Sequence, residues 1–212
     1  MFPTTRTQSS FPMRNLRLVL AMTAALVGAI AHALTVRPPT FEELVAQSDT
    51  IVRAEATGSR CEWWDSPRGR MIVTYVKFRV ETTLKGAAEG EIELRQLGGQ
   101  IGDERMVIEG LPQFGAGDRD YLFIVGNGRM MCPLVAIPHG RYPVVRDAAS
   151  QTDFVARADG TPLTAVGDVA RSLSEIGARP VLEQMKQAPM RASDFEAAIR
   201  TELKRQAAAS AH

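Results

Sequence analysis

The sequence predicts a mainly β protein, a small antiparallel barrel or sandwich with a short helix before its strands and another helix near the C-terminus. Short segments of alternating apolar and polar residues, separated by glycine-rich turns, predict the strands. Helical segments are missing between consecutive strands, which disfavours a parallel α/β fold because parallel strands need long crossover connections.

Residues 1–33 have the features of a secretory signal peptide. Arg14 and Arg17 begin the segment, an apolar run reaches Ile30, and Ala31-His32-Ala33 offers a small-x-small cleavage site. The apolar run is shorter than the ~20 residues that a membrane-spanning helix needs. We therefore expect cleavage after Ala33 and export to the periplasm or the medium, without a membrane anchor. Translation is expected to begin at Met1 or Met13.

The charge balance argues against nucleic-acid binding. The whole chain has 25 Lys and Arg, 24 Asp and Glu, and a formal net charge of +1. Loss of Arg6, Arg14 and Arg17 with the leader leaves 22 basic residues against 24 acidic ones, a net charge near −2. Nucleic-acid binding normally requires clustered Lys and Arg, and the sequence has no such run.

The expected mature chain begins with an extended leader at its prolines and continues into a short helix. Thr40 and Glu43 form a capping box, and Phe41, Leu44 and Val45 share one helical face. Alternation then predicts strands, most clearly over 72–81, and an uninterrupted apolar run predicts a fully buried strand over 121–125. The other predicted strands cover 51–57, 91–95, 106–108, 142–146 and 153–157, and the last two are expected to pair with each other.

A second helix is predicted over about 193–206. Ser193 and Glu196 have the spacing of a capping box, and Phe195, Ile199 and Leu203 form an apolar stripe. We assign residues 34–158 to the β-barrel domain and residues 159–212 to a C-terminal extension that contains this helix.

Cys61 and Cys132 are the two cysteines of the chain. In an oxidising compartment a disulfide between them is expected. Two buried free thiols are the alternative, because the sequence does not show whether the two α-carbons come within the ~7 Å that a bridge requires.

A composite pattern runs through 41–48, 74–86, Gly98-Gly99, 110–118 and Leu122-Phe123. It consists of a helix, an alternating strand ending in Leu-Lys-Gly, a Gly-Gly turn, a Gly-x-Pro-x-Phe-x-x-Gly-Asp loop and a Leu-Phe strand. In this pattern the chain resembles a group of secreted bacterial proteins of uncharacterised function, over roughly residues 36–146.

More distantly, the order of helix, strands and Pro-x-Phe-x-x-Gly loop is similar to netrin-like domains, which include the tissue inhibitors of metalloproteinases. This resemblance implies an OB-like, netrin-like barrel, that is, a fold rather than a function. Those inhibitors bind the protease zinc through an N-terminal cysteine. Here the expected first mature residue is Leu34 and the nearest cysteine is Cys61, so inhibition by that route is not expected.

The residues offer few routes to catalysis. His139 is the one histidine that is neither in the expected leader nor at the chain end, and no spacing typical of a zinc site or a serine nucleophile is found. We therefore expect no metal and no cofactor. Paired acids, such as those of a glycoside hydrolase, would need facing side chains; the candidates are Asp103, Glu104, Asp118 and Asp120.

Two adjacent tryptophans, Trp63 and Trp64, lie in a polar segment that we expect to connect two strands, close to Arg68 and Arg70. Adjacent side chains of an extended backbone point in opposite directions, so a small barrel buries one and exposes the other unless something covers it. Either the C-terminal helix covers this place, or the four residues form a contact patch for a partner.

These observations favour an exported, non-enzymatic binding module over an enzyme. Its expected partner is a secreted or periplasmic protein, with a protease as one candidate, and Trp63, Trp64, Arg68 and Arg70 are the expected contact residues. A hydrolase whose carboxylates converge in a barrel cleft is the first alternative. A structural envelope protein without a small ligand is the second.

Overall fold

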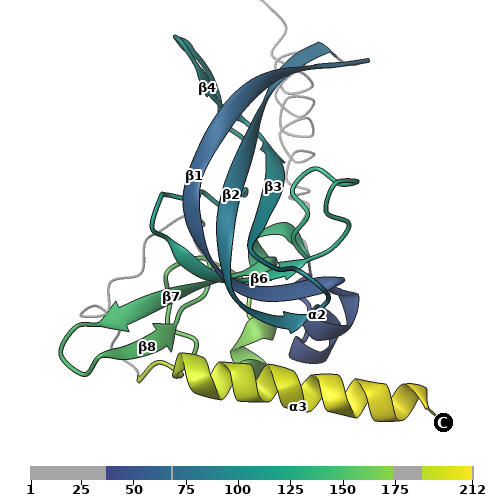
Figure 1. Ribbon diagram of the computed structural model, residues 1–212, viewed down its shortest axis with the longest axis vertical. Coiled ribbons are helices and arrows are strands. Elements are labelled where there is room, and N and C mark those ends of the chain that lie inside the picture. The colour runs from purple at the N-terminus through teal and green to yellow at the C-terminus, as the bar shows by residue number, and fades with distance from the viewer. Residues whose placement is uncertain (1–36, 68, 174–187, 212) are drawn as a thin grey trace, which may run out of the picture. The chain divides into compact units, whose positions relative to one another are not determined.

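Six antiparallel strands form the main sheet in the computed structural model, which describes residues 37–67, 69–173 and 188–211. The strand order is β3-β2-β1-β6-β7-β8, and β4 and β5 form a separate two-stranded sheet (Figure 1). The strands are β1 (Thr50–Ser66), β2 (Gly69–Lys85), β3 (Glu91–Leu97), β4 (Gly99–Ile101), β5 (Glu104–Met106), β6 (Arg119–Ile124), β7 (Arg141–Asp147) and β8 (Thr152–Val155). The predicted signal peptide over 1–33 lies outside the described residues.

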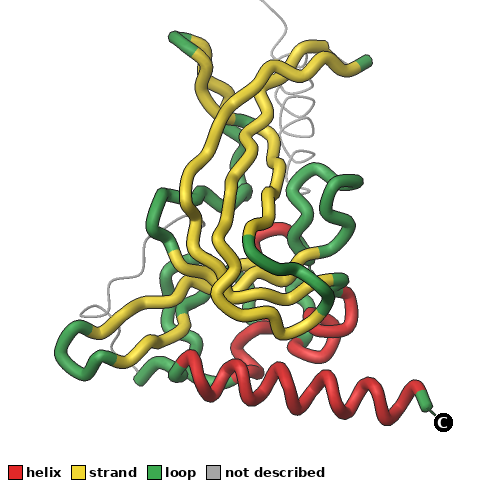
Figure 2. The backbone as a smooth tube through the Cα atoms, viewed as in Figure 1, coloured by secondary structure: helices red, strands yellow, loops and turns green. Residues whose placement is uncertain are grey.

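The mainly β class is confirmed, together with a short helix before the strands and a longer helix near the C-terminus (Figure 2). The helices are α2 (Phe41–Gln47) and α3 (Ala192–Ser210), and two 3-10 turns, η1 (Ile137–Gly140) and η2 (Val166–Ala170), lie between β6 and α3. Among the described residues no pairing joins β3 to β8, so strand pairing does not close the sheet into a barrel. All described residues belong to the unit that begins at Arg37.

The two longest strands, β1 and β2, form one continuous hairpin. Their pairing runs from Ile51 opposite Lys85 to Ser66 opposite Gly69. The sequence predicted much shorter strands, over 51–57 and 72–81, with a polar connection between them. That prediction was wrong about the connection, because alternation of apolar and polar residues marks a strand only where one face is covered and the other is solvated.

We divide the hairpin into a base, residues 50–56 with 78–85, and a distal half, residues 57–66 with 69–77. The base is paired on its other side as well, because β6 runs beside β1 from Thr50 to Glu55. The pairing register of the hairpin shifts between Ala56 and Gly58, where the two halves meet. Such a shift bends a strand and increases its twist.

Two apolar cores cover opposite faces of the sheet, and β6 contributes to both. Tyr121 and Phe123 belong to one core and Leu122 and Ile124 to the other. A strand that is buried on both faces reads as an unbroken apolar run, as predicted for 121–125. The helix-side core contains Phe41, Leu44, Val45, Tyr142, Phe195 and Ile199, and the second core contains Val52, Ala54, Ala56, Val76, Phe78 and Leu94.

The two predicted capping boxes have different outcomes. At α2 the box is confirmed, since the Thr40 amide donates to Glu43 Oε2 at 2.9 Å and the Glu43 amide donates to Thr40 Oγ1 at 3.2 Å. At α3 the box is wrong: Arg191 is the N-cap residue, without a side-chain cap, and Glu196 instead accepts a hydrogen bond from Tyr121 Oη at 2.9 Å. No helix in the described part of the chain combines the length and apolarity needed to cross a membrane.

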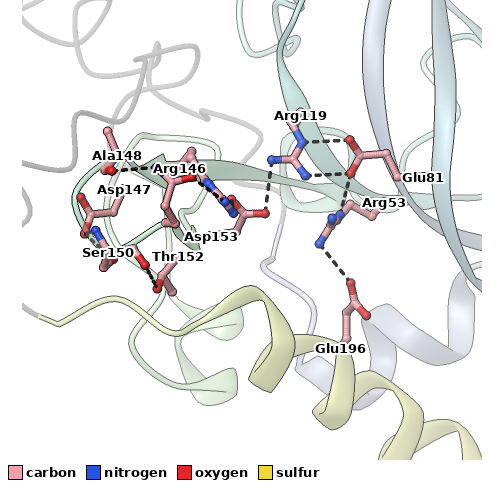
Figure 3. Close-up of polar contacts among 11 residues, drawn as sticks. Arg53, Glu81, Arg119, Arg146, Asp147, Ala148, Ser150, Thr152, Asp153 and Glu196 are labelled. Atoms are coloured by element: carbon pink, nitrogen blue, oxygen red, sulfur yellow. Dashed lines mark hydrogen bonds and ion pairs between the residues drawn. The ribbon is translucent and has the colours of Figure 1, made fainter.

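Ion pairs link α3 to the base of the sheet (Figure 3). Glu81 accepts hydrogen bonds from Arg53 Nε at 2.7 Å and from Arg119 Nε at 2.9 Å. Arg53 also approaches Glu196 at 3.5 Å, and Arg119 approaches Asp153 at 3.2 Å. Burial alone would raise the pKa of Glu81, but the hydrogen bonds from Arg119 and Arg53 outweigh burial and lower that pKa. These charges therefore join four strands and one helix.

Candidate binding groove

A groove of about 960 Å³ lies against the distal half of the hairpin. Side chains from β1, β2 and β3 form its floor, and the segment 98–114 forms its wall. The floor includes Ser59, Cys61, Thr74, Val76 and Gln96, and the wall includes Met106, Val107, Ile108, Leu111 and Phe114. The lining combines these apolar side chains with many polar groups, and a concave site that offers both can hold a ligand.

The wall begins at a pair of glycines that lies very close to the sheet. Gly98 and Gly99 both have positive φ, at 93° and 137°. A Cβ on Gly99 would lie 2.5 Å from Thr74 Oγ1 and 2.7 Å from Cys61 Sγ, closer than van der Waals contact permits. Thr74 Oγ1 also donates to the Gly98 carbonyl at 2.5 Å. Glycine is therefore required here by both conformation and space.

The Gly-x-Pro-x-Phe-x-x-Gly-Asp loop, residues 110–118, ends the wall and is anchored by one buried arginine. The Arg141 guanidinium lies 4.4 Å from the ring centroid of Phe114 and donates to the Gln113 carbonyl. It also donates to Asp120 Oδ1 at 2.7 Å and to Asp118 Oδ2 at 3.2 Å. Burial raises the pKa of Asp120, and Arg141 opposes that rise. The loop is thus held in place by several contacts to one side chain.

The aromatic ring of this loop also packs into the second core. Phe114 meets Phe78 edge to face, with ring centroids 5.0 Å apart. Two backbone hydrogen bonds tie the end of the loop to β1: the Ala56 amide donates to Asp118 O at 2.8 Å, and the Gly117 amide donates to Ala56 O at 2.7 Å. The wall is consequently a fixed part of the fold.

Gln96 is the most informative polar residue of the groove. It is only 8% exposed, yet its side-chain amide has no hydrogen-bond partner among the described residues. Every fully buried side-chain nitrogen or oxygen atom of the described residues has a hydrogen-bond partner. The unpartnered amide atoms of Gln96 are therefore not fully buried, and they are accessible from the groove. Nearly all buried polar groups are hydrogen-bonded. An amide left open to a groove is therefore suited to bind a ligand.

The sequence contained a signal for Gln96 that our predictions did not use. On β3, Ile92 and Leu94 belong to the second core, and Gln96 is the next residue on the same face. A polar residue that continues an apolar face of a strand is unusual.

The segment 106–108 was predicted as a strand, but β5 ends at Met106, and Val107 and Ile108 are 62% and 37% exposed beside the groove.

The tryptophans lie in β1 rather than in a connection. Trp63 is opposite Ile72, Trp64 is opposite Met71, and the two rings point to opposite faces of the hairpin. The Arg70 guanidinium lies 4.3 Å from the ring centroid of Trp63, and that of Arg95 lies 5.9 Å from Trp64, which remains 40% exposed. Both rings thus have a cationic neighbour. Arg68 lies outside the described residues.

The C-terminal helix does not cover these tryptophans. Its apolar residues Phe195 and Ile199 pack into the helix-side core with residues of α2 and β6. Trp63 lies on the same face of β1 as Ser59 and Cys61, both of which line the groove. The structure therefore places Trp63 beyond the end of the groove, and Trp64 on the other face.

The predicted disulfide is not formed in the structure, where Cys61 and Cys132 are both free thiols. Cys61 is opposite Thr74 on β2, Thr74 is opposite Gln96 on β3, and the Cys132 amide donates to Arg95 O. The two cysteines are thus separated by three inter-strand steps of about 4.8 Å each. This separation exceeds the ~7 Å limit for a bridge. Burial raises the pKa of the Cys132 thiol to about 11.

The carboxylates considered for hydrolysis are not brought together in the groove. Asp103 and Glu104 are exposed in the β4–β5 hairpin, and Asp118 and Asp120 contact Arg141 instead of facing one another across a cleft. None of these four residues lines the groove. Within the described residues, no group of three or more His, Cys, Asp or Glu side chains is placed to hold a metal ion.

His139 is buried in η1, with 7% of its surface exposed. Burial lowers its pKa, Arg157 lowers it further, and Asp159 opposes them. The neutral imidazole is thus favoured, as in a structural histidine.

No protein-family model matches the chain, and no curated protein matches its sequence. The groove is therefore the main guide to function.

Proposed function

We propose that the chain is an exported, non-enzymatic binding module, and that its groove binds a polypeptide segment of another secreted or periplasmic protein. The observation that carries this proposal is the Gln96 amide, which is buried, lacks a partner among the described residues and is accessible from the groove. A peptide group offers one donor and one acceptor, the same pair that a glutamine amide needs.

The composition of the groove supports a polypeptide over a charged ligand. Among the described residues, its lining contains one arginine, Arg105, and one acid, Glu109. The remaining groups are apolar side chains, neutral polar side chains and glycine backbone. A nucleic acid or a phosphorylated ligand would require an excess of positive charge. An uncharged segment that combines apolar side chains with amide groups matches this lining.

We also propose that the sheet curls into an OB-like, netrin-like barrel that a loop completes in place of a strand pair. The Cys132 amide donates to Arg95 O at 2.8 Å, and Asn127 Nδ2 donates to Glu93 O at 3.2 Å. The segment that follows β6 therefore lies along the free edge of β3. The resemblance to netrin-like domains supports the same arrangement, and the resemblance to secreted bacterial proteins supports export.

The peptide-binding proposal can be tested with a displayed library of random dodecapeptides, selected on the purified protein. We expect enriched peptides, with affinities about five- to tenfold weaker for the Gln96→Leu variant, because leucine keeps the side-chain volume but removes the amide. The unfolding temperature should change little, since the Gln96 side chain forms no hydrogen bond with the described residues.

Gln47→Leu is the matched control, because Gln47 is exposed at the end of α2, outside the groove lining. This variant should bind the selected peptides as the unaltered protein does. A library that yields no enriched peptide would refute the proposed function. If the enriched peptides bind Gln96→Leu and the unaltered protein equally, the peptides do not bind through Gln96, and the groove is not their binding site.

A further inference from the structure

The distal half of β1 has an unpaired edge. On one side, β1 pairs with β2 up to Ser66. On the other side, its pairing with β6 ends at Glu55 opposite Arg119, and the last backbone contacts are those of Ala56 with Gly117 and Asp118. From residue 57 to Asp65, no described residue pairs with β1 on that second side.

An unpaired strand edge presents a row of amide and carbonyl groups that can pair with another strand. Natural proteins commonly protect such edges with proline, lysine or inward-pointing charges. Residues 57–66 contain no proline or lysine. Arg60, the one basic residue of this stretch, is held over the face of the hairpin, where it bonds to Glu62 and Glu93 and lies 4.3 Å from the Tyr75 ring centroid.

This edge adjoins the groove. Ser59 and Cys61 both line the groove and both belong to the unpaired stretch of β1. A strand added at this edge would continue the row that β6 occupies at the base. Because side chains alternate along a strand, every second side chain of the added strand would point to the groove side and the others to the opposite face.

We infer that a partner polypeptide binds by β-strand addition to β1 at residues 57–65, and that its apolar side chains at alternating positions fill the groove. This inference rests on the proposed function and specifies its ligand: an extended, uncharged segment with apolar residues at every second position. Main-chain hydrogen bonds supply affinity in this mode, and the pockets for alternate side chains supply specificity.

A partner segment fits this site better than a second copy of the same edge. Paired with itself, β1 would offer the groove either Ser59, Cys61 and Trp63 or Arg60, Glu62 and Trp64, that is, one tryptophan among small or charged side chains. Most of the apolar wall formed by Met106, Val107, Ile108 and Phe114 would then remain without apolar contacts. We therefore infer that the bound segment belongs to a different protein.

The test uses a synthetic decapeptide of alternating valine and threonine, blocked at both ends, with the purified protein. Its matched control has the same side chains but carries N-methyl groups on alternate residues, so that one edge of the peptide has no donors. We expect the control to bind about tenfold more weakly or worse. Amide hydrogen exchange should slow at alternate residues of 57–65 when the unmethylated peptide binds.

Ser59→Arg provides a second measurement, because it places a long charged side chain at the edge beside the groove. We expect it to abolish binding of the decapeptide, whereas Ser210→Arg, at the exposed end of α3, should not. Binding without slower exchange in 57–65, or without sensitivity to N-methylation, would refute strand addition while the library result upheld the proposed function.

The remaining outcomes also decide between the two proposals. A decapeptide that does not bind refutes strand addition, while enrichment from the random library alone decides the proposed function. A protein that doubles in mass by light scattering without peptide, and returns to a monomer with Ser59→Arg, would identify a second copy as the occupant and overturn the inference.

Discussion

The two halves of one hairpin differ in what surrounds them. At the base, Val52 and Ala54 of β1 and Phe78 of β2 are fully buried, β6 pairs along β1, and a helix-side core covers the other face. In the distal half, Ile72, Val73 and Val76 of β2 are still buried, but β1 has an unpaired edge, Trp64 is 40% exposed, and an open groove lies against one face.

This difference indicates that the hairpin has two roles. An isolated strand pair is only marginally stable and needs further strands or helices packed against it. The base obtains them from β6, α2 and α3. The distal half can therefore keep one strand edge unpaired without depending on it for stability. Changes at the base should therefore affect stability, whereas changes in the distal half should affect binding.

The largest expected effect is at the base, with Phe195→Ala. Phe195 is fully buried, and its ring lies among those of Phe41, Tyr121, Phe123 and Tyr142, with centroids 5.3–6.2 Å apart. We expect a loss of about 3–5 kcal/mol in the free energy of unfolding, measured with urea. Phe195→Leu should lose clearly less. A loss below about 1 kcal/mol for alanine would show that α3 is not part of the base.

The next effect concerns the anchor of the loop 110–118. Arg141→Leu leaves the wholly buried Asp120 without its cationic partner, so we expect a loss of about 3 kcal/mol in unfolding free energy. Arg146→Leu is the control, because this arginine is half exposed and pairs with Asp153; it should lose about 1 kcal/mol or less. Equal losses in the two variants would contradict the anchoring role of Arg141.

Gly99→Ala should have an intermediate effect on stability, because this glycine of β4 lies outside the hairpin and holds the groove wall close to it. The added Cβ meets Thr74 Oγ1 and Cys61 Sγ, and the φ of 137° is unfavourable for alanine, so we expect a loss of about 1–3 kcal/mol. Gly58→Ala has open space around its Cβ and should change stability by about 0.5 kcal/mol or less. Thermal unfolding of the two variants side by side makes the comparison.

The smallest effect is the pH response of His139, the one histidine of the described residues. Burial lowers its pKa in the folded state, so the unfolded chain, with a histidine pKa of about 6.5, takes up the proton first. The stabilisation is present above that value and is lost as pH falls through the folded-state pKa. His139→Gln should therefore lose less stability between about pH 7 and pH 5. If the urea midpoint shifts equally between these two pH values in His139→Gln and in the unaltered protein, this expectation is contradicted.

The sequence predicts the parts of the fold that have strong local signals. The capping box of Thr40 and Glu43 is local in sequence and is confirmed, and so are the buried strand β6 and the pairing of β7 with β8. The capping box at Ser193 fails because Glu196 is needed by Tyr121 and Arg53, which come from distant strands. Local chemistry is overridden there by contacts that spacing does not reveal.

The candidate site could be predicted only in part. Trp63, Trp64 and Arg70 were predicted as contact residues, but none of them lines the groove. The place of the two tryptophans in a strand was missed because no side chain of β1 is buried beyond Ala56. The groove depends on how segment 98–114 lies against β1, β2 and β3, and one sequence does not specify such a contact. The same limit applies to Cys61 and Cys132, whose separation is set by the two strands between them.

The most direct test of the two-role account measures binding and stability together in one variant from each half. Ser59→Arg, in the distal half, is expected to abolish peptide binding in titration calorimetry while leaving the unfolding temperature unchanged. Ile199→Val, in the helix-side core, is expected to lower that temperature by about 2–4 °C and leave binding intact. A Ser59→Arg protein that still binds, or an Ile199→Val protein that stays folded but no longer binds, would contradict the account.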